Sequence, residues 1–406
     1  MAGVLSLASQ GVTPELLRAS GNWLATHSIY DGSTSNIRSS TNIFLIWEGS
    51  ELGLGHYTSL RTLLHHHPKD SIYIYSNTLD EDRTMQPFRE HGFDNVNVVR
   101  YDCAALTAGT VAASFGALLQ STLVATKFNF TAAEQRLGTR WLRTQFSDWL
   151  RTVLLYRFGG LYVDFDVIIF RNLLQYRNLV GSSFSLRMQT CHTSYSQQLL
   201  RNLSHAHSLN IGGRSVRCVT DSLMALDRGH PWLRGVLQAA PSVFESCRHS
   251  LKPWAQYSCL TSPLYTGIAV ALLPNVSLLS TVHAVDWSDL FCAMLDVGQS
   301  KYGTGSNAWW NMPDPHGELE KNVSRACYTW HRFSSSGAAT KRLALTARKG
   351  TLGYRLLARH KAWPNVNTRP TPVRSRPSLG VKHANSNDLD GTTCQAGPTP
   401  GSVACL

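Results

Sequence analysis

Phe158-Gly-Gly-Leu-Tyr-Val-Asp-Phe-Asp166 is the stretch on which the prediction of the fold rests. The residues before it repeat apolar side chains at the spacing of an amphipathic helix, and Ser147 and Asp148 suit its N-terminus. Gly159 fits a left-handed C-cap, where a glycine ends a helix at little steric cost. The chain then runs through three apolar residues into two aspartates, and Val167–Phe170 follows as a second apolar run. This order predicts a helix that returns as a buried strand. The apolar face of the helix is expected to consist of Leu150, Val153, Leu154 and Phe158.

Strand and helix patterns alternate on both sides of this stretch. Short apolar runs predict strands at Asn42–Trp47, Ser71–Tyr75, Asn95–Val99 and Asp221–Leu226. Helical spacing predicts helices at Ser59–His67 (stopped by Pro68), Met85–His91 and His230–Phe244. Residues 181–217 are polar and predict a loop. Together these patterns predict an α/β fold with a mostly parallel central sheet flanked by helices.

Asp164 and Asp166 form a pair of carboxylates at the end of the predicted strand. In an extended segment, residues two apart project to the same side, so we expect both carboxylates to face one ligand. Open α/β sheets bind ligands at the carboxyl ends of their strands, and hard divalent cations prefer oxygen ligands. The alternative is an ordinary solvated turn, where this tripeptide is common. The apolar runs on both sides favour a metal site.

The composition restricts the class of partner. The chain has 406 residues, of which 43% are hydrophobic and 16% charged, and its formal net charge is +12. A basic chain suits nucleic acid, a membrane surface or an anionic small substrate such as a nucleotide diphosphate. Residues 341–376 contain many basic residues and no acid, which is typical of a solvated basic segment. No zinc-finger spacing or aromatic-basic RNA motif accompanies them, so we expect no nucleic-acid partner.

The ends of the chain and its cysteines leave the compartment open. The nine cysteines include no C-x-x-C pair, and they fit a secreted enzyme with disulfides as well as a reduced cytosolic protein. Four N-x-S/T sequons are close to the number expected by chance. No apolar stretch is long enough to span a membrane. We expect residues 1–40 to be weakly ordered, and residues 364–406, rich in Pro, Ser, Thr and Gly, to be a disordered tail.

The block Ser147–Asp166 resembles the S-D-x-x-R…G-G-x-Y-x-D-x-D block of sugar transferases with the GT-A fold. That block occurs in the α1,4-galactosyl/N-acetylglucosaminyltransferase family, in yeast-type α1,6-mannosyltransferases and in clostridial toxin glucosyltransferases. Asn42–Asp102 resembles the plant-type branch of the α1,4 family. Asp221–Pro231 and Tyr328–His331 are similar to the later part of that family, which favours it over the mannosyltransferases. The likeness covers about residues 42–360.

This resemblance implies a GT-A-type, Rossmann-like catalytic domain over residues 41–363. Its donor-binding half would be about 41–180 and its acceptor half about 215–363. It implies a retaining, metal-dependent hexosyltransferase that moves galactose or N-acetylglucosamine from a UDP-sugar to a glycan or glycolipid, with Mn²⁺ or Mg²⁺ as cofactor. The Golgi lumen or membrane is the expected location, and membrane association would need an anchor that this chain lacks.

The resemblance also implies roles for single residues. Asp166 matches a direct metal ligand, and Asp164 matches a residue that contacts the donor ribose and the metal. Asp164, Asp166 and Asp221 are expected to be catalytic. The expected donor-binding residues are Asp148, Arg151, Tyr162, Asp164 and His331. Without the resemblance, Asp148 and Arg151 would be read as a helix cap and an exposed helix arginine. His331 suits a metal or phosphate contact and a core histidine equally well.

Several departures from the family pattern leave other functions open. Thr220-Asp221 and Leu260–Pro263 replace the usual residues near the acceptor and the far face of the donor, and Arg332-Phe-Ser replaces the usual residues after His331. The alternatives are an α1,6-mannosyltransferase-like enzyme that uses GDP-mannose and a non-catalytic sugar-binding relative. Aspartyl-phosphate phosphohydrolases also carry a strand-end D-x-D. Their motif continues to a threonine, where this chain has Ile168, and that class fits poorly.

Overall fold

The computed structural model describes most of the first half of the chain and parts of the second. The described residues are 42–174, 178–183, 209–211, 214–216, 218–248, 282–286, 313–327, 329–331 and 349–359, with Leu260 and Tyr265. The segments expected to be weakly ordered, 1–40 and 364–406, lie outside them. The division of the chain into these segments and one catalytic domain therefore stays a prediction.

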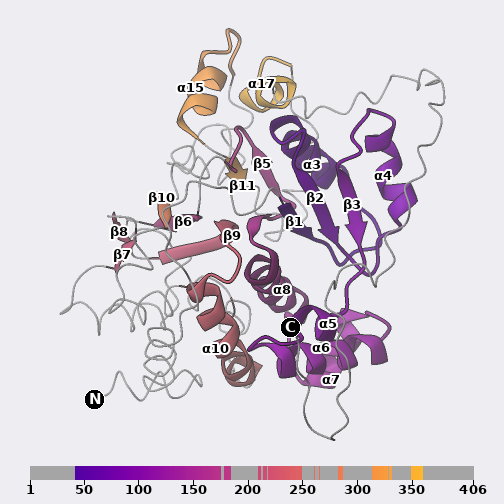
Figure 1. Ribbon diagram of the computed structural model, residues 1–406. Helices are drawn as coiled ribbons and strands as arrows, with labels where there is room; N and C mark the ends of the chain where they lie inside the picture. Colours follow the sequence, from indigo (N-terminus) through magenta and orange to yellow (C-terminus); the bar gives the residue numbers. More distant parts are fainter. Residues whose placement is uncertain are drawn as a thin grey trace, which may run out of the picture. The chain divides into compact units, whose positions relative to one another are not determined.

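A seven-stranded mixed sheet forms the centre of the described fold (Figure 1), in the order β10-β6-β9-β4-β1-β2-β3. Strand β9 is antiparallel to both of its neighbours, and the other neighbouring strands are parallel. The predicted α/β fold with a mostly parallel central sheet is confirmed. The strands are β1 (Asn42–Ile46), β2 (Ser71–Tyr75), β3 (Val96–Val99), β4 (Gly160–Val163), β6 (Leu179–Ser183), β9 (Cys218–Leu226) and β10 (His283–Asp286).

Two smaller sheets accompany the central one. Strand β5 (Val167–Ile169) pairs antiparallel with β11 (Thr329–His331), so a late segment lies beside the strand that follows the two aspartates. Strands β7 (Leu209–Ile211) and β8 (Arg214–Val216) form a hairpin. Residues 181–217 were predicted to be a loop, and that prediction is wrong for the parts that form β6, β7 and β8. These strands are only three to five residues long, which is too short for an apolar period to stand out in the sequence.

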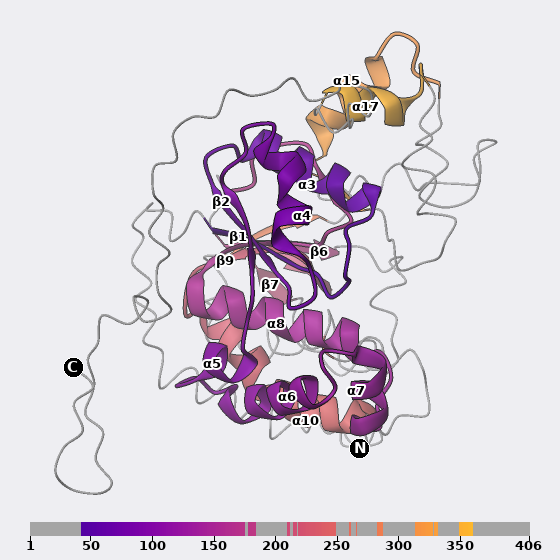
Figure 2. The same ribbon diagram turned by 90° about the vertical axis from the view of Figure 1, so that its right-hand side faces the viewer.

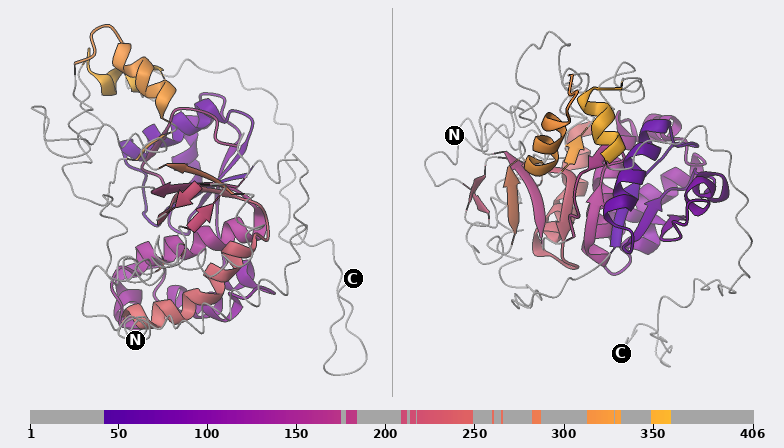
Figure 3. Two further views of the ribbon diagram at one scale, coloured as in Figure 1. Left: turned by 90° about the vertical axis from the view of Figure 1, so that its left-hand side faces the viewer. Right: turned by 90° about the horizontal axis from the view of Figure 1, so that it is seen from above.

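Helices cover both faces of the central sheet (Figures 2 and 3). Successive residues of a strand face opposite sides, and β1 shows the result. Ile43 and Leu45 pack in the core under α3 and α4, whereas Phe44 and Ile46 pack in the core formed with α8 and α10. The helices are α3 (Leu54–His66), α4 (Glu81–Arg89), α5 (Cys103–Thr107), α6 (Ala113–Ala125), α7 (Phe130–Leu137), α8 (Leu142–Phe158), α10 (Pro231–Arg248), α15 (Glu318–Ala326) and α17 (Leu352–Arg359). Among the described residues, no helix has both the length and the apolar character needed to cross a bilayer.

Helix α8 begins earlier than the sequence predicts. Ser147 and Asp148 lie inside it, because the helix starts at Leu142. The first residue of the helix is capped from a distance, since the Leu142 backbone N–H donates to the Glu134 carboxylate of α7 at 2.8 Å. A cap that comes from another helix leaves no local signature in the sequence. Gly159 ends the helix with a positive φ of 65°, but its ψ of 173° is outside the left-handed helical region that was predicted.

The strand order reverses beside β1. From β1 the chain proceeds to β2 and β3 on one side, and β4 is added on the other side. In open α/β sheets, the crevice at the carboxyl ends of the two strands that flank such a reversal is where ligands bind. The ends of β1 and β4 flank this crevice. The two aspartates directly follow β4, so the topology places them at the expected ligand site.

Candidate functional site

The two aspartates lie in a tight turn between β4 and β5. The Val167 backbone N–H donates to the Asp164 carbonyl at 3.1 Å and closes the turn. The Asp164 N–H donates to the Ser222 carbonyl at 3.0 Å, which extends the pairing of β4 with β9 by one residue. The prediction that Asp164 and Asp166 lie in an extended segment is therefore wrong. The two carboxylates are brought to one end of the sheet by a turn between two buried strands.

The middle residue of the turn anchors it to the core. Phe165 is 5% exposed, and its ring packs edge-on against Trp47, with the ring centroids 5.7 Å apart. It also meets the His56 ring at 5.9 Å. A buried ring between the two acids limits how far the turn can move, because displacing it would open a cavity.

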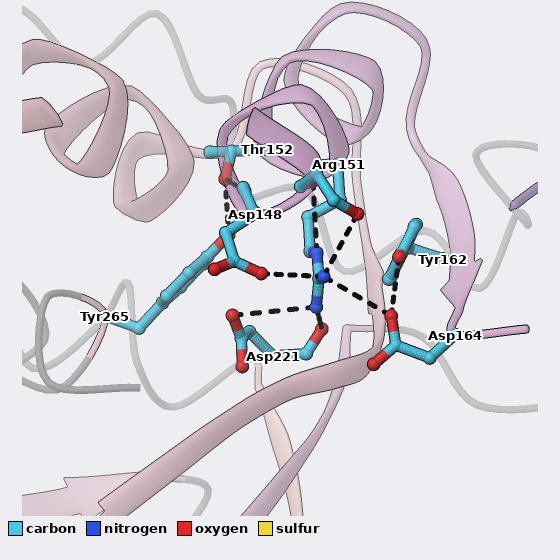
Figure 4. A network of polar contacts seen from close by, with 8 residues as sticks. Asp148, Arg151, Thr152, Tyr162, Asp164, Asp221 and Tyr265 are labelled. Carbon is cyan, nitrogen blue, oxygen red and sulfur yellow. Dashed lines mark hydrogen bonds and ion pairs between the residues drawn. The ribbon is translucent and has the colours of Figure 1, made fainter. Parts of the chain in front are cut away.

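Arg151 of α8 lies at the centre of a buried polar cluster (Figure 4). Its Nη2 is 2.7 Å from Asp148 Oδ1 and 3.3 Å from Asp164 Oδ1. Its Nη1 donates to the Asp221 carbonyl at 2.8 Å and is 3.6 Å from that residue's Oδ2. Arg151 thus joins three other residues predicted to be functional, namely Asp148 of the same helix, Asp164 after β4 and Asp221 of β9. The alternative of an exposed helix arginine is wrong, because Arg151 is 4% exposed.

Tyr162 of β4 contacts two members of the cluster, Arg151 and Asp164. The Arg151 guanidinium lies over its ring, 4.4 Å from the centroid, and its hydroxyl donates to Asp164 Oδ1 at 2.6 Å. Tyr162 is only 1% exposed. These contacts fix the orientation of Asp164, which retains a side-chain exposure of 23%. The predicted contact between Tyr162 and a donor stays a prediction.

Burial and charge act against each other in this cluster. Burial raises the pKa of Asp148 well above its ordinary range, although Arg151 opposes that shift. Burial disfavours the charged form of Arg151, yet Asp164, Tyr162, Asp148 and Asp221 hold its pKa well above its usual value. Oδ2 of Asp148 is buried and has no hydrogen-bond partner among the described residues. Buried polar atoms without partners are rare and call for an explanation.

Three further residues hold the cluster, and none of them was predicted to be a site residue. Ser147 accepts from Arg151 Nε through its carbonyl at 3.3 Å. The Thr152 hydroxyl donates to the Asp148 carbonyl at 2.9 Å and is hydrogen-bonded to the Tyr265 hydroxyl. Tyr265 is fully buried, and its carbonyl accepts from the Trp232 indole at 2.9 Å. Only the S-D-x-x-R spacing could have indicated Ser147, and nothing local indicates Tyr265.

His331 lies next to the turn by strand register. It pairs with Val167, the residue that directly follows Asp166. A residue 165 positions later in the chain is therefore placed beside the second aspartate through its backbone. Its role as a donor or metal contact stays a prediction.

A second D-x-D tripeptide, Asp80-Glu81-Asp82, has a different environment. The Asp80 carboxylate caps α4 by accepting from the Arg83 N–H at 2.9 Å. Asp82 pairs with Arg89 and is 97% exposed. These acids serve a helix N-terminus, where negative charge is favourable. The comparison shows that the flanking buried strands, and not the tripeptide, distinguish residues 164–166.

The acids at the end of β4 fit a divalent cation in part. Asp148, Asp164 and Asp221 bring three negative charges to one guanidinium, so the cluster has an excess of negative charge when all are ionised. Carboxylate oxygens are suitable ligands for Mn²⁺ or Mg²⁺. In the part of the chain that is described, however, no group of three or more His, Cys, Asp or Glu side chains is arranged to hold a metal ion. Mg²⁺ sites that share substrate phosphates need only one or two carboxylates.

Comparison with known families bears on this site directly. Residues 56–185 match the glycosyltransferase sugar-binding region containing DXD motif. The matched range begins in α3, ends beyond β6 and includes five of the predicted site residues: Asp148, Arg151, Tyr162, Asp164 and Asp166. Asp221 and His331 lie beyond it. The match supports a glycosyltransferase, and therefore a transferase that acts on a sugar donor and an acceptor.

More distant similarities extend along the chain. An uncharacterized protein of Arabidopsis thaliana is 25% identical over 144 residues, which are 35% of this chain and 20% of that protein. The PaToxG glycosyltransferase is 15% identical, with a TM-score of 0.35, over 64% of this chain and 78% of that chain. The bifunctional glycosyltransferase WbbM is 9% identical, with a TM-score of 0.35, over 82% of this chain and 52% of that chain.

Proposed function

We propose that this chain is a retaining glycosyltransferase that moves a hexose from a UDP-sugar to a glycan or glycolipid acceptor, with Mn²⁺ or Mg²⁺ bound at Asp164 and Asp166. Galactose and N-acetylglucosamine are the favoured sugars. The observation that carries the proposal is the cluster of three carboxylates around Arg151 at the carboxyl end of β4. It lies at the topological switch point, where α/β sheets bind ligands. The retaining outcome rests on the resemblance to the α1,4 family.

The charges of the cluster support a cation and a diphosphate together. Asp166 is proposed to bind the metal directly, and Asp164 to contribute to its shell and to the donor ribose. When bound, the metal neutralises charge that grows on the diphosphate as the bond to the sugar C1 breaks. Tyr162 and Arg151 hold Asp164 Oδ1 from two sides, so its carboxylate is oriented before a ligand arrives. Such preorganisation avoids reorganisation during the reaction.

Asp148 and Asp221 are proposed to face the sugar. Both are buried beside Arg151, at 3% and 6% exposure, and Asp148 Oδ2, which has no hydrogen-bond partner among the described residues, is an acceptor that a sugar hydroxyl would satisfy. A site that hydrogen-bonds a hydroxyl rejects sugars that lack it, because its own buried group is then left unpaired. His331 is proposed as a further donor or metal contact because its backbone pairs with Val167.

The Golgi lumen is the proposed location. Cys327 is disulfide-bonded, and disulfides persist in the oxidising compartments of the secretory pathway. Asn129, in one of the sequons, is exposed at the start of α7. A glycan or glycolipid acceptor is consistent with that compartment.

Ligand-dependent thermal unfolding tests the proposal. A ligand that binds only the folded state raises the unfolding midpoint. We expect UDP-galactose or UDP-N-acetylglucosamine to raise it with Mn²⁺ and to lose this effect after EDTA. Asp166→Asn should abolish the shift and the transfer of sugar while the fold is kept, since the amide retains the shape and loses the charge.

Asp82→Asn is the matched control, because it changes the second D-x-D at an exposed helix end. It should leave the ligand shift unchanged. Full activity of Asp166→Asn, or turnover that survives exhaustive chelation, would reject the metal site. A shift with GDP-mannose alone would favour the mannosyltransferase-like alternative. Binding without hydrolysis or transfer of the donor would identify a non-catalytic sugar-binding relative.

A further inference from the structure

Glu48 is a buried acid at the switch point that the proposed metal site does not use. It follows β1 by two residues, and Tyr101 follows β3 by two residues. The Tyr101 hydroxyl donates to Glu48 Oε1, so the pair lies across the carboxyl end of the intervening strand β2. Strand β1 is also the direct neighbour of β4, which Asp164 directly follows. Glu48 and Asp164 therefore follow neighbouring strands at one edge of the sheet.

Among the described residues, the second carboxylate oxygen of Glu48 has no hydrogen-bond partner. Glu48 is 7% exposed, and its Oε2 is buried without a hydrogen bond in the part of the chain that the structure describes. Burial raises the pKa of Glu48 to about 7, although Tyr101, Arg143 and Arg100 favour the ionised form. An ionised carboxylate in this place is therefore poorly compensated by the protein.

Glu320 is an equally buried acid in the same chain whose two carboxylate oxygens both accept hydrogen bonds. It is also 7% exposed. Its Oε1 accepts from the Ser324 hydroxyl at 3.1 Å and from Arg359 at 2.9 Å, and its Oε2 is 3.3 Å from Arg359. Both of its oxygens have donors. In the described part of the chain Glu48 has a donor for one oxygen and none for the other, and departures of this kind are expected at functional sites.

We propose that Glu48 is a specificity-determining contact for the nucleoside of the donor, and that its Oε2 accepts a hydrogen bond from a base N–H or a ribose hydroxyl. Neighbouring strands are about 4.8 Å apart, so a diphosphate held at the end of β4 leaves its nucleoside within reach of the end of β1. The ligand supplies the donor that the described residues do not supply. This inference rests on the proposed function, because it requires a nucleoside diphosphate in the crevice.

Two variants remove the acceptor in different ways. In Glu48→Gln, the carbonyl takes the hydrogen bond from Tyr101, and an N–H₂ group then faces the ligand in place of Oε2. In Glu48→Met, both oxygens are lost at nearly constant length. We expect each variant to bind UDP in Mn²⁺ at least tenfold more weakly than the wild type, with an unfolding midpoint at pH 8 that is unchanged or higher. Calorimetric titration and thermal unfolding measure the two quantities.

Analogues of UDP distinguish the two sources of the hydrogen bond. If the ribose donates, 2′-deoxy-UDP should bind the wild type weakly, and Glu48→Gln should weaken it no further. If the base donates, 3-methyl-UDP should instead be the analogue that binds the wild type weakly and that Glu48→Gln weakens no further. Glu320→Gln is the matched control, and it should lower the unfolding midpoint while the affinity for UDP is kept.

Unchanged UDP affinity in both Glu48 variants would overturn the inference and leave the proposed function standing. A loss of affinity that comes with a fall in the unfolding midpoint as large as that of Glu320→Gln would assign Glu48 a structural role and also overturn it. If the wild type itself binds no nucleoside diphosphate with Mn²⁺, the proposed function fails, and this inference fails with it.

Discussion

Arg151 shows at the scale of one residue why the site needs a planar guanidinium. Its Nε, Nη1 and Nη2 all donate, to the carbonyl of Ser147, the carbonyl of Asp221 and the carboxylate of Asp148 respectively. The same Nη2 also holds Asp164 at 3.3 Å. A lysine ammonium is a single point of charge and cannot reach such separated partners at once.

Arg151→Lys should therefore damage both stability and catalysis. The change keeps the charge but leaves buried acceptors without donors, so we expect the free energy of unfolding to fall by about 2 kcal/mol. Asp164 loses the contact of its Oδ1 with Arg151 Nη2, and we expect kcat/KM per folded molecule to fall tenfold or more. Urea unfolding and steady-state kinetics on one preparation measure both effects.

The control for this variant is Arg157→Lys, in the last turn of the same helix, where the side chain donates to the carbonyls of Leu106 and Ala108. It should leave the kinetics unchanged. If Arg151→Lys loses stability but keeps normal kinetics per folded molecule, the guanidinium serves the fold and has no positioning role for Asp164.

The local part of this cluster was predictable from sequence, and the remote part was not. Asp148 and Arg151 are three residues apart on a helix, so their contact follows from helical geometry, and the 2.7 Å distance confirms it. The return of the chain through Gly159 was also predicted, and at the end of that return Asp164 Oδ1 lies 3.3 Å from Arg151 Nη2. Asp221 lies 70 positions after Arg151, and its contact depends on how β9 adds to the sheet. No local pattern encodes that pairing.

Gly160 illustrates at the scale of an element how tightly β4 lies against β1. Its φ is +119°, and a Cβ atom built on it would lie 2.4 Å from the Asn42 carbonyl oxygen. That atom belongs to the backbone of β1, so it cannot move aside as a flexible side chain would. The β1–β4 pairing begins at the next residue, where Ile43 is paired with Leu161.

Gly160→Ala should therefore destabilise the sheet and disturb the site. We expect a loss of about 3 kcal/mol in the free energy of unfolding, from the unfavourable φ and the clash together. Asp164 lies at the other end of the same short strand, so metal-dependent binding of UDP should weaken as well. Chemical denaturation and a UDP titration with Mn²⁺ measure these effects.

Gly109→Ala is the control that separates the cost of a positive φ from the cost of the clash with β1. Gly109 also has a positive φ, +72°, but nothing lies within 4 Å of the position that a Cβ atom would take there. The substitution should cost only about 1 kcal/mol and leave UDP binding intact. Equal losses in the two variants would show that the approach of β4 to β1 contributes nothing.

Element boundaries were predictable where one local signal dominates. The apolar runs of β1 and β2 stand between polar residues, and the predicted strands agree with the observed ones to within a residue. The start of α8 was not predictable, because Ser147 and Asp148 resemble a cap while the actual first N–H is held by Glu134 of another helix. The aspartate pair was expected in an extended segment. Its turn was not predictable, because the turn is closed by a backbone hydrogen bond that any sequence can make.

Glu48 affects the stability of the whole molecule, since unfolding exposes its carboxyl group to water. Its pKa is about 7 in the folded chain, compared with an ordinary value of 4.5. The folded state therefore keeps a proton that the unfolded state loses between these pH values. Stability falls with rising pH wherever the folded state binds more protons. The contribution of Glu48 is fully present below about pH 4.5 and is lost as the pH rises through about 7.

The stability of Glu48→Gln relative to the wild type should consequently depend on pH. Near pH 4 the protonated acid and the amide are nearly equivalent, and we expect similar free energies of unfolding. The difference should grow as the pH rises and level off above about pH 7, where the variant is more stable by on the order of 3 kcal/mol. Asp148, whose pKa burial also raises, titrates in both chains, and its effect cancels in the difference. Urea unfolding of both proteins from pH 4 to pH 8 measures this curve.

A difference that stays flat across the range would show that Glu48 is ionised in the folded protein throughout, with Oε2 already compensated. A variant that is less stable above pH 7 would show that the carboxylate stabilises the fold, and that its retention needs no ligand to explain it.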